Sequence, residues 1–199
     1  MRFRTIAPIL LLAALAACGE RAGQPQTETT GTADAVSETT TASATTTAAS
    51  GGTSSDMTPQ DKEFVSNAGM AGLAEVQMGN LALQNATSAD VKAFAQRMVT
   101  DHSKSNEELQ QLATTKGVAL PAELDAGHKS ALDHLTSLSG AEFDKAYMQH
   151  MVEDHRKAVD LFTTGSTASQ DADLKAWAGR TLPTLQQHLQ LAQTVAGKT

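Results

Sequence analysis

The sequence is poor in cysteine, in basic residues and in recognisable catalytic motifs. Cys18 is the only cysteine among 199 residues, so a disulfide-stabilised fold is excluded. Lysine and arginine number 15 against 22 acidic residues, which gives a formal net charge of −7 at pH 7 and leaves no basic patch. This balance argues against binding to nucleic acid or to an anionic lipid surface.

Three kinds of chemistry also lack their sequence motifs. The chain contains no Ser-His-Asp arrangement, no glycine-rich phosphate-binding loop and no haem-attachment motif. No segment alternates between apolar and polar residues with the period of two that marks a half-buried strand. The sequence therefore predicts neither a hydrolase nor a nucleotide-binding enzyme, and it predicts no β-sheet.

The N-terminus has the pattern of a signal peptide over residues 1–18. Arg2 and Arg4 precede an apolar run, Ile6–Ala17, that ends at Cys18. The run is too short to span a membrane as a helix. Removing the two arginines with this segment takes the formal charge from −7 to −9, so we expect an acidic mature protein.

The end of this apolar run favours lipidation. Leu15, Ala16, Ala17 and Cys18 resemble a bacterial lipobox, in which the cysteine is acylated and becomes the first residue of the mature chain. Ordinary secretory cleavage is the alternative. Gly19 in place of aspartate resembles the outer-membrane sorting pattern, so we predict a lipoprotein held to the outer membrane by acyl chains and facing the periplasm.

Residues 19–57 predict a disordered tether. Threonine, alanine, serine, glycine, glutamine and glutamate dominate this segment, and it has no aromatic residue. Such a composition buries too little apolar surface to offset the loss of chain entropy on folding.

Residues 58–197 predict an all-α domain, because apolar residues recur here with the 3.6-residue period of a helix. Four amphipathic segments are expected: one from Thr58-Pro59 to a break at Ala86-Thr87, one that ends near Gly117, one after a capping box at Ser139–Glu142, and one from about Leu174 to Val195. The connection between the second and third helices is long enough to run back along the bundle. We therefore predict a ferritin-like four-helix bundle whose second and third helices are parallel.

The heptapeptide MVTDHSK at residues 98–104 is nearly repeated as MVEDHRK at residues 151–157. The two copies place His102 and His155 about 21 Å from the same end of parallel helices, at 1.5 Å per residue. Glu75 on the first helix and His188 on the fourth lie about 13–15 Å from that end. Each predicted helix thus has one ionisable residue on its apolar stripe, and side chains that lean towards their own N-termini can converge.

Three imidazoles and one carboxylate form a ligand set for Zn, Fe or Cu and a poor one for Ca or Mg. We therefore predict a single metal site formed by Glu75, His102, His155 and His188. A buried hydrogen-bonded network of the same four side chains, without metal, is the alternative. Val99 and Leu185 stand where a di-iron bundle needs glutamates, so a ferritin-like oxidoreductase is the least favoured function.

Five further residues lie near this predicted site in the sequence. Asp101 and Asp154 each precede a histidine by one residue, which places them about 100° round the helix, and we favour a surface position for both. Tyr147 is expected at the rim with its hydroxyl in water. His128 and His134 lie in the crossover and are expected to be exposed.

The chain resembles the bacterial envelope family known as domain of unknown function 4142. The resemblance runs from about Pro59 to Ala196 and rests on VKAFAQRMVTDHSKSNEEL, FDKAYMQHMVEDHRKAVDLF and LPTLQQHL. It implies a ferritin-like fold, export from the cytoplasm, and recurring motifs that contain His102, His155 and His188. It implies no activity, so an interaction module that binds another envelope protein stays open beside metal storage, buffering or sensing.

Overall fold

The computed structural model describes residues 57–199, so Cys18, the predicted signal peptide and almost all of the predicted tether lie outside the described part. Within it the chain forms five helices and no strand: α1 (Pro59–Asn85), α2 (Ala89–Thr115), α3 (Ala126–Thr136), α4 (Gly140–Ala168) and α5 (Ala172–Ala196). The prediction of an all-α fold is confirmed. None of these helices has a stretch both long and apolar enough to cross a membrane.

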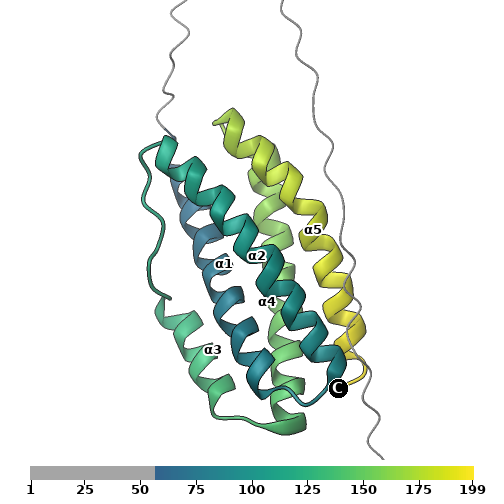
Figure 1. Cartoon of the computed structure of the whole chain (residues 1–199). Coiled ribbons are helices and arrows are strands. Elements are labelled where there is room, and N and C mark those ends of the chain that lie inside the picture. The colour runs from purple at the N-terminus through teal and green to yellow at the C-terminus, as the bar shows by residue number, and fades with distance from the viewer. Residues whose placement is uncertain (1–56) are drawn as a thin grey trace, which may run out of the picture. The chain divides into compact units, whose positions relative to one another are not determined.

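The four long helices pack as a bundle in which α1 and α5 are diagonal to each other. Helix α1 packs against α2 and α4, and α5 packs against the same two helices. Figure 1 shows the segment after α2 returning along the bundle to its other end, with α3 in its course, before α4 begins. Helices α2 and α4 consequently run in the same direction, and α3 packs against α1 and α4.

The beginning of α1 follows the prediction. The Thr58 hydroxyl accepts a hydrogen bond from the Asp61 amide at 3.1 Å, and the Asp61 carboxylate accepts from the Thr58 amide at 3.3 Å, with Pro59 at the first helical position. Asp61 is buried, and its other oxygen accepts from the Gln170 amide at 3.2 Å. One carboxylate therefore fixes both the start of α1 and the α4–α5 turn.

The predicted capping box at the beginning of α4 is wrong, although the helix does begin after Ser139. The Ser139 side chain makes no capping hydrogen bond there. Gly140 has a φ of 61°, a left-handed conformation that favours glycine and turns the chain into the helix. The buried polar contacts of the first turns of α4 come from Asp144, which bonds to Thr87 and Ser88.

Asp144 joins α4 to the α1–α2 turn. Its carboxylate is buried and accepts hydrogen bonds from the Thr87 amide at 3.0 Å, the Thr87 hydroxyl at 2.6 Å and the Ser88 amide at 2.8 Å. These bonds satisfy backbone donors just before α2 and join the α1–α2 turn to α4.

We expect Asp144→Ala to lower the free energy of unfolding by about 2–3 kcal/mol, because it removes a buried, charged acceptor of three hydrogen bonds. Denaturant unfolding measures this loss. Asp160→Ala is the control, since Asp160 is exposed on the same helix, and its effect is expected to stay within about 0.5 kcal/mol. Equal losses in the two variants would contradict this account of the turn.

The apolar core is divided into two clusters by a polar layer. One cluster contains residues such as Met78, Phe94 and Tyr147, and the other contains residues such as Phe64 and Trp177. On three long helices a buried histidine separates the two clusters: His102 on α2, His155 on α4 and His188 on α5. On α1 the buried Glu75 follows Ala74, the first α1 residue of the Met78 cluster. The fold thus places all four predicted residues at one level of the bundle.

Candidate metal centre

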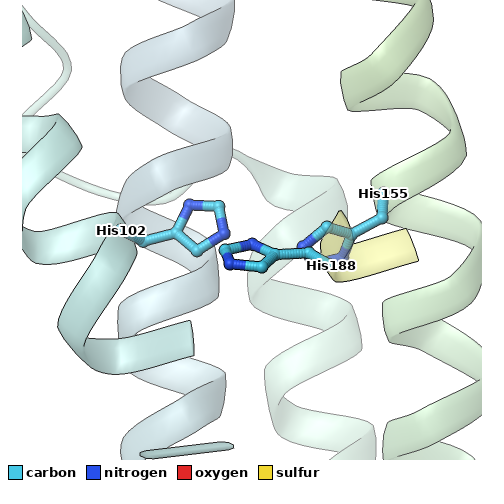
Figure 2. Close-up of side chains that lie close together, drawn as sticks. All are labelled: His102, His155 and His188. Atoms are coloured by element: carbon cyan, nitrogen blue, oxygen red, sulfur yellow. The ribbon is translucent and has the colours of Figure 1, made fainter. Parts of the chain in front are cut away.

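Three histidines from three helices meet in the interior. Figure 2 shows the rings of His102, His155 and His188 turned towards one another. One nitrogen from each ring lies within 4.8 Å of the other two, and the ring centroids are 5.4–5.6 Å apart. All three side chains are buried.

Each of these rings has one buried nitrogen without a hydrogen-bond partner: Nε2 of His102, Nε2 of His155 and Nδ1 of His188. The other nitrogen of two rings is engaged. His155 Nδ1 lies 2.9 Å from the Met151 carbonyl, to which it donates, and His188 Nε2 lies 2.9 Å from the Asp101 carboxylate. Donation from these nitrogens leaves a lone pair on His155 Nε2 and on His188 Nδ1, the arrangement found in metal-binding histidines.

Glu75 lies beside this group and outside it. Its Oε1 is 3.4 Å from His155 Nδ1, the nitrogen on the far side of the ring from the free Nε2, and its Oε2 has no partner. The group of mutually close ligand atoms contains the three histidines alone. The structure therefore brings all four predicted residues to one level but places the carboxylate behind one imidazole.

Burial controls the protonation of the centre. It lowers the pKa of His188 to about 4 and the pKa of His102 well below its usual value, and it lowers the pKa of His155 as well. The nearby imidazoles lower the pKa of His102 further. At neutral pH the three rings are consequently uncharged, which is the form that binds a metal ion.

The Glu75 carboxyl responds to burial in the opposite direction. Burial, followed by the nearby charge of Asp154, raises its pKa to about 8. Without a cation the carboxyl is therefore mostly protonated at neutral pH. A cation close to Glu75 would favour its ionised form.

Stability of the metal-free protein should fall in acid. A histidine whose pKa is lowered on folding stabilises fully above its unfolded pKa near 6.5, and this contribution is lost as the pH falls through its folded pKa. For His188, with a folded pKa of about 4, the loss between pH 7 and 4 is about 3 kcal/mol. Urea unfolding in the presence of chelator measures it, and His188→Gln should show a correspondingly smaller loss. Parallel pH profiles for the two proteins would contradict the assignment.

The expected surface position of Asp101 and the expected rim position of Tyr147 are wrong. Asp101 is half-buried and contacts His188, because α5 packs beside the face of α2 that carries it. Tyr147 is fully buried, stacks on Phe143 with a centroid distance of 6.0 Å, and has a hydroxyl without a protein partner. No signal in the sequence identified the Asp101–His188 contact, since periodicity does not say which helix covers a given face.

The remaining neighbours are mixed. The surface position expected for Asp154 is also wrong, because its side chain is only 17% exposed and its Oδ2 lies 2.8 Å from His150 Nε2. His134 is exposed as predicted, but the His128 side chain is half-buried, and its Nδ1 lies 2.9 Å from Asp125. The residues on the α3 and α4 side of the centre thus include two histidine–carboxylate pairs.

Comparison with known proteins places the chain in a family. The sequence matches the family described as "Domain of unknown function (DUF4142)" over residues 28–195. The chain belongs to this family. No curated protein matches the sequence.

Solved structures share the fold of this DUF4142 chain at low sequence identity. A DUF305 fragment from Deinococcus radiodurans has a TM-score of 0.64 and 14% identity, covering 72% of this chain and 99% of its own. CopM in the Cu(II)-bound form has a TM-score of 0.60 and 17% identity, covering 69% and 96%. The protein rv2844 from Mycobacterium tuberculosis has a TM-score of 0.54 and 12% identity, covering 69% and 91%. These likenesses show a common helical bundle.

Proposed function

We propose that the protein binds one transition-metal ion through His102, His155 and His188 and thereby stores, buffers or senses that metal. The observation that carries this proposal is a group of three buried, uncharged rings, each of which offers one nitrogen within 4.8 Å of the other two and each of which has one buried nitrogen without a partner. A buried polar atom without a partner is costly, so three that face one another favour a common ligand. A purely structural network would have paired them.

Copper(II), zinc(II) and iron(II) are the candidate ions, because imidazole nitrogens suit all three and suit Ca²⁺ or Mg²⁺ poorly. Copper(II) is favoured among them by two arguments. Nitrogen ligand sets bind Cu²⁺ most tightly in the divalent series. In addition, CopM, one of the proteins with the same fold, is known in a Cu(II)-bound form.

Glu75 belongs to the proposed centre through His155. Its distance of 3.4 Å from His155 Nδ1 favours a role in holding that ring over a role as the fourth ligand. Asp101 holds His188 in the same manner from the other side. The Met151 carbonyl and the Asp101 carboxylate set which nitrogen is free on His155 and on His188, and Glu75 lies beside the first of these rings.

We further propose that the domain is a lipoprotein of the outer membrane facing the periplasm, with Cys18 acylated and residues 19–57 as its tether. The sequence pattern around Cys18 supports this proposal. The long crossover between α2 and α4 is the connection found in ferritin-like bundles, and we propose that relationship on the same ground.

Metal analysis of the purified full-length protein, exposed to one equivalent of Cu²⁺ and then desalted, tests the proposal. We expect one ion per chain in the wild type and less than about one tenth of that in the variant His102→Ala/His155→Ala/His188→Ala, because three ligands are lost. His134→Ala is the matched control, since His134 is exposed on α3. Retention of metal by the triple variant, or none in the wild type, would overturn the proposal and favour the interaction module.

A further inference from the structure

A cavity of about 260 Å³ leads from the surface to the three-histidine centre. His102 and Glu75 line its inner part, and Trp177 lines its wall. Asp154 on α4 and Asp125 and His128, which flank the beginning of α3, also line it. Five side chains capable of binding a metal, from four different segments of the chain, therefore line one cavity.

Two deeply buried atoms on this cavity lack partners. Glu75 is 5% exposed and has a free Oε2, and His102 is 8% exposed and has a free Nε2. These two atoms do not depend on the carboxylates at the mouth. They offer ligands at the inner end of the cavity to a cation that enters it.

Most of the charged groups at the mouth are paired with neighbouring side chains. Asp125 holds His128 at 2.9 Å. Lys157, which also lines the cavity, is engaged at 2.8 Å by Glu153 and at 3.6 Å by Asp154. A cation at the mouth thus meets two carboxylates and one ammonium that is already paired.

A second groove approaches the centre from the α2–α5 side, and its charge is opposite. Asp101, whose carboxylate contacts His188, is one of its lining residues. The groove is lined by two acidic side chains, Asp101 and Glu108, and by three cationic ones, Arg97, Lys104 and Arg180. These five side chains give the second groove a formal net charge of +1. At the mouth of the first cavity, Asp125, Asp154 and Lys157 give a formal net charge of −1. Long-range attraction therefore favours the first opening for a cation.

We propose that the divalent ion of the metal centre enters through the cavity between Asp154 and the beginning of α3, attracted by Asp125 and Asp154 at its mouth before Glu75 passes it to His102. This inference rests on the proposed function, because it assigns a route to the same ion. Its consequence is kinetic. A side chain that acts only along the route changes the rates of entry and exit by the same factor and leaves the equilibrium affinity unchanged.

Stopped-flow fluorescence of the full-length protein with Cu²⁺ tests the route, because Trp177 is the only tryptophan and lies on the cavity. In Asp125→Asn/Asp154→Asn we expect association and dissociation both to slow by about fivefold, with Kd within about twofold of the wild type. Asparagine retains the capping ability of residue 125 at the start of α3. The association rate of the wild type should also fall more steeply with added salt than that of the variant.

The matched control alters the other groove. Lys104→Gln/Arg180→Gln should leave the association rate unchanged, whereas entry on that side would make this variant faster than the wild type. Unchanged rates in Asp125→Asn/Asp154→Asn, or a weaker Kd with an unchanged association rate, would overturn the route while the metal centre stands. Absence of Cu²⁺ binding to the wild type would overturn the centre itself, and the route with it.

Discussion

Cu²⁺ at a free concentration of about 1,000 times its Kd should raise the midpoint of thermal unfolding of the full-length protein by about 10–20 °C. The ion binds the folded state alone, because only the fold brings His102, His155 and His188 together, and at a free concentration of about 1,000 times Kd it stabilises by about 4 kcal/mol. For a domain of this size, each kcal/mol of stabilisation raises the unfolding midpoint by several degrees.

Differential scanning calorimetry with and without the ion measures this shift. His188→Ala should lose most of it, since it removes one of the three ligand nitrogens, and His134→Ala should keep it. A shift smaller than about 2 °C in the wild type, or an equal shift in His188→Ala, would show that the ion does not bind at the centre of the bundle.

Replacing Glu75 by glutamine should make the metal-free protein more stable at alkaline pH by about 3–5 kcal/mol. A carboxyl whose pKa is raised on folding, here from 4.5 to about 8, stabilises below its unfolded pKa, and that contribution is lost as the pH rises through its folded pKa. Glutamine has nearly the same shape and no proton to lose, so its stability should not fall over this range.

Urea unfolding in chelator at pH 5 and at pH 8.5, values that bracket most of this titration, measures the difference between the two proteins. Glu142→Gln is the control, because Glu142 is exposed in the first turn of α4 and its replacement should leave the pH dependence close to that of the wild type. A Glu75→Gln profile parallel to the wild-type profile would mean that Glu75 is not buried against His155 in solution.

The level of the four polar residues was predictable from the sequence, because the rise and period of a helix fix where each residue lies along its own axis. His102 and His155 follow from the repeated heptapeptide, and the length of the crossover sets their two helices parallel. The capping of α1 by Thr58 also depends on local sequence alone. These features require only the geometry of one helix at a time.

Contacts between helices were not predictable in this way. The periodicity of α2 places Asp101 about 100° from His102, but only the packed bundle shows that α5 covers that side and brings His188 within 2.9 Å. Its counterpart in the second copy of the repeat, Asp154, pairs with His150 and lines the cavity. Two nearly identical heptapeptides therefore have different neighbours. The orientation of the Glu75 carboxylate behind His155 depends on rotamers that sequence patterns do not specify.

A crystal of the full-length protein soaked with one equivalent of Cu²⁺ tests the metal centre most directly. The account predicts one anomalous difference peak about 2.0–2.1 Å from His102 Nε2, His155 Nε2 and His188 Nδ1. A peak at another set of side chains would contradict it, and so would the absence of a peak in crystals soaked in a solution that contains copper.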